Sequence, residues 1–72
     1  MKYPEYLVAI DERRNRVFVI ARPNLIAVKK DDMWYYGEAP PDEEVDNHYE
    51  LVTDLVKAKK WVVEARAELK LL

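Results

Sequence analysis

Residues 16–30 read RVFVIARPNLIAVKK, and this stretch decides the fold. Two runs rich in β-branched and aliphatic residues, 16–22 and 25–30, flank the turn dipeptide Pro23-Asn24, which predicts an antiparallel hairpin. The simplest hairpin has a two-residue turn, but Pro23 cannot adopt the positive φ that such turns favour. A wider turn would shift the register by one residue and exchange the two faces of the strands that follow.

The flanking sequence extends this hairpin on both sides. Residues 6–11 (YLVAID) and 33–37 (MWYYG) have the same character, and the turn-forming residues ERRN (12–15) and Asp31-Asp32 separate them from the hairpin. We therefore predict a four-stranded antiparallel meander over about residues 3–37. Residues 38–41 end in Pro40-Pro41 and predict an extended linker.

The rest of the chain predicts one long helix over about residues 42–71. It contains no glycine or proline, and Asp42 is a suitable N-cap with Glu43 and Glu44 in the first turn. We therefore interpret the acid-rich run at residues 38–54 as acidic side chains that stabilise the start of the helix through its dipole. The expected fold is a single α+β domain, residues 1–72, in the order ββββα, with the helix packed on one face of the sheet.

Side-chain alternation assigns the strand residues to two faces. The face expected under the helix is almost wholly apolar: Tyr6, Val8, Ile10, Val17, Val19, Ala21, Ile26, Val28 and Tyr35. The opposite face mixes bases, aromatics and aliphatics, and its candidate binding residues are Arg16, Phe18, Arg22, Lys29, Trp34 and Tyr36. Aromatic side chains flanked by bases are typical of sheet surfaces that bind single-stranded nucleic acid.

The predicted helix is too long for the predicted sheet. A helix of this length spans roughly 40–45 Å, whereas strands of six residues span roughly 20 Å. Either the helix breaks near Asp46-Asn47 and again later, or another chain covers the apolar excess. We expect a homo-oligomer, most simply a two-fold dimer. Its candidate interface residues are Val52, Val56, Trp61, Val63, Leu69 and Leu72.

The composition excludes most catalytic chemistry. The chain has no serine and no cysteine, a single glycine and a single histidine, so serine and cysteine nucleophiles and glycine-rich phosphate loops are excluded. His48 lies near Glu44 and Glu50, but one histidine with carboxylates is a weak metal signal, and we interpret it as a surface or interface residue. We predict neither an enzyme nor a metal or cofactor site.

Composition also bears on origin and location. Loss of glutamine and cysteine with 36% charged residues is typical of hyperthermophile proteins and of designed sequences, and both predict thermostability. No apolar run approaches a membrane span of roughly 18 residues, and the N-terminus shows no secretory signal. We therefore expect a cytoplasmic protein without a membrane partner.

Two functional hypotheses follow from these features. The favoured one is a small, stable, self-associating binding or structural domain, either a de novo protein or a hyperthermophile or viral regulator that binds a protein partner. The alternative is single-stranded nucleic-acid binding through the aromatic and basic sheet face. The net charge of −2 disfavours this alternative, because nucleic-acid affinity comes chiefly from neutralised phosphates.

Overall fold

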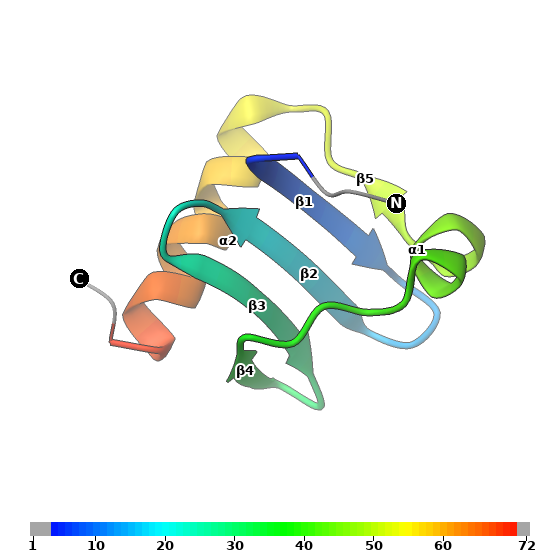
Figure 1. Cartoon of the computed structure of the whole chain (residues 1–72), viewed down its shortest axis with the longest axis horizontal. Coiled ribbons are helices and arrows are strands. Elements are labelled where there is room, and N and C mark those ends of the chain that lie inside the picture. The colour runs from blue at the N-terminus through cyan, green and yellow to red at the C-terminus, as the bar shows by residue number, and fades with distance from the viewer. Residues whose placement is uncertain (1–3, 71–72) are drawn as a thin grey trace.

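The computed structural model describes residues 4–70. It contains one five-stranded antiparallel sheet in the order β4-β3-β2-β1-β5, with helix α2 packed across one face (Figure 1). The elements are β1 (Tyr6–Asp11), β2 (Arg16–Ala21), β3 (Leu25–Lys30), β4 (Met33–Tyr36), α1 (Asp42–His48), β5 (Glu50–Leu51) and α2 (Leu55–Glu68). The α+β class and the four-stranded meander are confirmed, and β5 is an additional short strand.

Two of the three predicted turns have the expected length. Asp11 pairs with Arg16 across a four-residue loop, and Lys30 pairs with Met33 across Asp31-Asp32. Both turn aspartates have positive φ, 53° and 62°, as a type I′ hairpin turn requires. Aspartate tolerates this left-handed conformation better than most residues, which explains its use at this turn.

The turn at Pro23 is wider than the simplest prediction. Ala21 pairs with Leu25, so three residues connect β2 to β3 and the register is shifted by one. The physical reason is that the φ of proline is fixed near −65°, which excludes the tight turn. The predicted faces of β1 and β2 are correct, whereas those of β3 and β4 are exchanged.

The exchange changes which side chains α2 covers. Leu25, Ala27 and Trp34 belong to the core under α2, whereas Val28 and Ile26 belong to the second core on the opposite face. The prediction that Ile26, Val28 and Tyr35 lie under the helix is therefore wrong.

The prediction of a single long helix is also wrong, because the chain leaves the helical conformation after His48. Residues 49–53 (YELVT) are rich in β-formers, and β5 pairs with β1, where Leu51 lies opposite Ala9. The side chain of Asp54 then accepts hydrogen bonds from the backbone N–H groups of Val56 and Lys57 and starts α2. The predicted break near Asp46-Asn47 is observed just after it, at His48, whereas the predicted later break is absent from α2, which is continuous from Leu55 to Glu68.

The start of α1 differs in detail from the prediction. Pro41 occupies the N-cap position and Asp42 is the first helical residue. Three acidic residues fill the first turn, as expected from the helix dipole. The segment after β4 crosses the sheet face opposite α2 before it reaches α1 (Figure 1).

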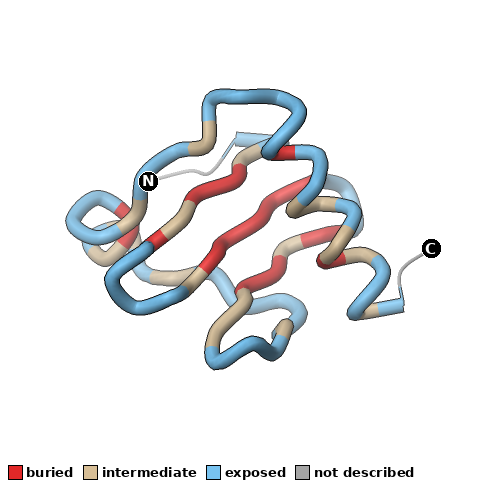
Figure 2. Tube along the Cα trace, turned by 180° about the vertical axis from the view of Figure 1, so that it is seen from behind, coloured by how far each residue is buried: buried red, intermediate tan, exposed pale blue. Residues whose placement is uncertain are grey.

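The core has two layers, one on each side of the sheet. Figure 2 shows the buried positions as continuous stretches of the central strands. On one side, the buried Ala58 and Ala65 bring α2 close to the sheet, since small side chains permit a close approach. On the other side, Phe18 is fully buried and meets Tyr49 edge to face at 6.4 Å.

Helix α2 is short enough to lie within the length of the sheet. The 14 residues of α2 span about 21 Å, which matches the strands. Among residues 4–70, no helix is both long enough and apolar enough to cross a membrane.

Candidate functional site between helix α2 and the sheet

A cluster of charged and aromatic side chains joins α2 to strands β3 and β4. The Nζ of Lys29 donates a hydrogen bond to Oε2 of Glu64 at 2.9 Å, and Nε1 of Trp34 donates to the same oxygen at 3.0 Å. The ammonium of Lys29 also lies 6.0 Å from the ring centroid of Trp34 and 5.5 Å from that of Trp61. One carboxylate of α2 thus receives bonds from two strands.

The protonation state of Glu64 follows from these contacts. The hydrogen bond from Lys29 lowers its pKa below the ordinary value, partial burial opposes this, and the bond from Trp34 lowers the pKa further. Glu64 is therefore ionised at neutral pH, and Lys29 compensates its charge.

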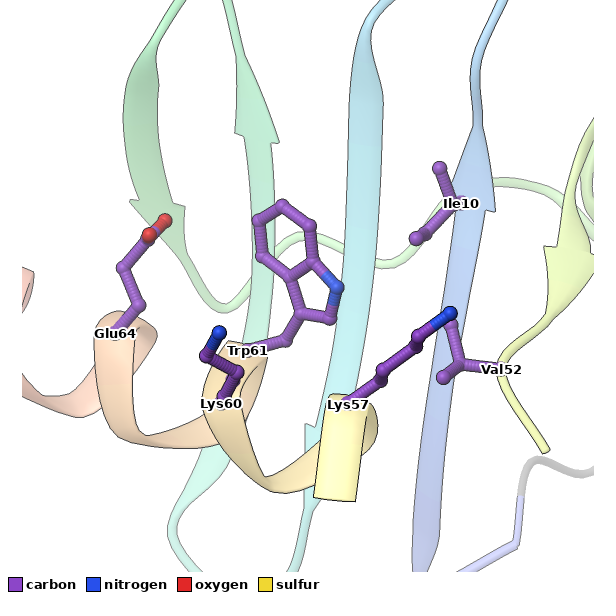
Figure 3. A pocket seen from close by; sticks show the side chains of 6 residues that line it. All are labelled: Ile10, Val52, Lys57, Lys60, Trp61 and Glu64. Carbon is purple, nitrogen blue, oxygen red and sulfur yellow. The ribbon is translucent and has the colours of Figure 1, made fainter. Parts of the chain in front are cut away.

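A hollow of about 430 Å³ lies beside this cluster, between α2 and the sheet (Figure 3). Trp61 extends from α2 over the sheet, Lys57 reaches toward Val52 on one side of it, Lys60 lies close to the helix on the other side, and Ile10 projects from β1. The hollow is lined by Ile10, Val52, Lys57, Lys60, Trp61 and Glu64. Within residues 4–70, neither Lys57 nor Lys60 forms an ion pair or a side-chain hydrogen bond. The hollow therefore combines an apolar floor with two uncompensated positive charges.

A separate ion-pair network fixes α1 against the first hairpin. Arg14 lies 2.9 Å from Glu44 and 3.1 Å from the buried carboxylate of Asp11, and Arg16 lies 3.4 Å from Glu44. Burial first, and then the nearby charge of Glu44, raises the pKa of Tyr49. These contacts explain the arrangement of α1 structurally, without a ligand.

The six residues predicted to share a binding face do not share one. Phe18 is buried under the second layer of the core, whereas Lys29 and Trp34 lie on the other side of the sheet with α2. Among residues 4–70 there is consequently no continuous aromatic and basic face of the kind expected for single-strand binding. Arg16 and Lys29 are each engaged by a glutamate of a different helix.

Two of the six lie near the turn between β2 and β3. Arg22 is exposed in this connection, and its backbone N–H donates to the carbonyl of Glu5. The hydroxyl of Tyr36 donates to the carbonyl of Asn24 at 3.2 Å and ties β4 to the same turn.

The residues predicted to form the oligomer interface do not lie on one surface. Val52, Trp61 and Leu69 pack against the core under α2, whereas Val56 and Val63 are exposed. Leu72 lies outside the described residues.

The sequence reasoning missed the hollow, although a signal for it exists. Lys57, Lys60 and Trp61 have i, i+3, i+4 spacing and therefore lie on one side of a helix. Ile10 was predicted to lie on the face under the helix, but the contribution of Val52 could not be foreseen, because it depends on the break between α1 and α2.

His48 is exposed at the end of α1. In the part of the chain that the structure describes, no group of three or more histidine, cysteine, aspartate or glutamate residues is placed to hold a metal ion.

Comparisons with known proteins do not identify a family. The chain matches no family model, and no curated protein or solved structure shows significant similarity to it. Its function must therefore be argued from its own residues.

Proposed function

We propose that this chain is a non-enzymatic binding domain that associates with a second copy of itself through the outer side of α2. The observation that carries the proposal is the exposure of Leu55, Val56 and Val63, at 69%, 72% and 65%. Val56 and Val63 are about two helical turns apart and lie on the side away from the buried Ala58 and Ala65. Such apolar patches on a helix are typical of protein–protein contacts.

Charge supports a second copy as the partner. Lys59 and Lys60 lie between Val56 and Val63 in sequence and share a surface depression with them. We call Val56, Lys59, Lys60 and Val63 the basic-apolar face of α2. A partner for this face should offer acidic groups around an apolar side chain.

The chain itself carries such a surface. Glu12, Asp46 and Glu50 line one hollow near the end of α1, together with Arg13 and the partly buried Ile10. We call Glu12, Asp46 and Glu50 the acidic patch. None of its three carboxylates has an ion-pair partner among residues 4–70. In a two-fold dimer the contact between the basic-apolar face and the acidic patch would occur twice.

The oligomeric state measured by sedimentation tests this proposal. The wild-type chain should associate at high micromolar concentration, and the association should weaken as salt screens the charges. A monomer at low salt and high micromolar concentration would overturn the proposal.

A charge exchange identifies the two surfaces. Lys59→Glu and Glu50→Lys should each weaken self-association, because each brings like charges together. An equal mixture of the two variants should associate again, since both contacts then join opposite charges. Failure of the mixture to associate, with both variants folded by circular dichroism, would show that these surfaces do not meet.

A further inference from the structure

We propose that the hollow between α2 and the sheet binds a small molecule with a flat apolar body and one anionic group. The volume of about 430 Å³ lies within the roughly 300–1,000 Å³ range of small-molecule sites. Lys60 lines both this hollow and the basic-apolar face, so the two proposals are separated by their tests: ligand binding is measured with a probe and self-association without one.

The apolar part of the ligand would contact three side chains from three segments. Ile10, Val52 and Trp61 are partly buried and pack against the same core cluster. The indole of Trp61 stands over the sheet within the hollow (Figure 3). An aromatic wall of this kind favours a planar ligand, which can stack on the ring or meet its edge.

The charge of the hollow selects an anion. Lys29 and Trp34 already compensate the carboxylate of Glu64 at 2.9 and 3.0 Å. Lys57 and Lys60, which are three residues apart and extend from the same side of α2, keep their charges uncompensated. An anionic group bound in the hollow would be attracted by both charges.

The site is also held in place before a ligand arrives. Its walls belong to α2 and to the sheet, and the bonds from Lys29 and Trp34 to Glu64 fix the two relative to each other. Preorganised walls reduce the entropic cost of binding.

The test compares matched probes by isothermal calorimetry. Naphthoate should bind about tenfold more tightly than naphthylmethanol, which has the same body without the charge, a difference typical of a charge-assisted hydrogen bond. Adenosine monophosphate serves as the second anion and distinguishes a nucleotide from an aromatic carboxylate as the preferred source of the anionic group. Equal affinity for naphthoate and naphthylmethanol, or no binding of either anion at millimolar concentration, would overturn the proposal.

Variants place the binding in the hollow. Lys57→Gln with Lys60→Gln should lower the affinity for naphthoate about tenfold or more, whereas Lys70→Gln, just beyond the end of α2, should change it less than about twofold. All three lysines are exposed, so the variants should fold, which thermal unfolding can verify. An equal loss in Lys70→Gln would show that the binding is unspecific attraction to a basic chain. Self-association is measured without probe, so either proposal can fail alone.

Discussion

Replacement of Glu64 by alanine tests the contact that joins α2 to the sheet. The substitution removes the acceptor of the bonds from Lys29 and Trp34. Alanine is the best helix former, so the change carries no penalty in helix propensity. The loss of stability should therefore report the two bonds alone.

The size of the loss follows from exposure. The side chains of Lys29 and Glu64 are 23% and 41% exposed, so the pair resembles a surface salt bridge, worth about 0.5–1 kcal/mol. The indole N–H of Trp34 adds about 1 kcal/mol through a hydrogen bond to a carboxylate that water also reaches. We expect Glu64→Ala to lower the free energy of unfolding by about 1.5–2 kcal/mol. For a domain of this size that corresponds to a decrease in Tm of about 6–16 °C.

The assay is denaturant unfolding followed by circular dichroism. Glu68→Ala is the matched control, because Glu68 is exposed on the same helix and has no side-chain bond among residues 4–70; it should change stability by less than about 0.5 kcal/mol. A double-mutant cycle of Glu64→Ala with Lys29→Met should give a coupling energy of about 0.5–1 kcal/mol.

Equal losses in Glu64→Ala and Glu68→Ala would refute this reasoning. Zero coupling energy between Lys29 and Glu64 would contradict the strand register as well as the contact. With a two-residue turn at Pro23, Lys29 would point away from α2, so zero coupling would contradict the three-residue connection itself.

Other predictions concern pH, helix ends and turns. The folded-state pKa of Glu64 is lower than its ordinary value of 4.5. The ionised carboxylate therefore contributes its full stabilisation above pH 4.5, and this stabilisation is lost as the pH falls through the folded-state pKa. Glu64→Gln should reduce this acid dependence in unfolding curves measured at a series of pH values. Asp54→Ala removes the N-cap of α2 and should lower the free energy of unfolding by about 1 kcal/mol in the same assay. Ala65→Leu inserts volume where α2 meets the sheet and should cost about 1–3 kcal/mol, whereas an unchanged midpoint would mean that the interface is loose. Asp32→Gly at positive φ should keep or raise thermal stability, and a loss above about 1 kcal/mol would contradict the I′ turn.

Local sequence signals predicted those parts of the fold that local physics decides. Alternation gave the strands, and the adjacent aspartates gave the tight turn between β3 and β4, because both tolerate positive φ. The break between α1 and α2 was harder to predict. Val52 and Thr53 have only a weak preference against helix, and pairing of β5 with β1 is a tertiary contact that overrides it.

The register at Pro23 shows why the candidate site was not predicted. Pro23 disfavours the tight turn, but both turn lengths bury aliphatic residues on each face of β3, so hydrophobic patterning alone could not choose between them. The polar side chains do distinguish the two registers, because Lys29 and Trp34 find an acceptor on α2 in the observed register.

The same turn sets the charge of the hollow. In the observed register Lys29 compensates Glu64, which leaves Lys57 and Lys60 as two free positive charges beside Trp61. In the shorter-turn register Lys29 would lie on the opposite face, and Glu64 would compensate one of those two lysines instead. The preference for an anion would then be weaker. A zero coupling energy between Lys29 and Glu64 would therefore also predict a weaker selectivity for naphthoate over naphthylmethanol.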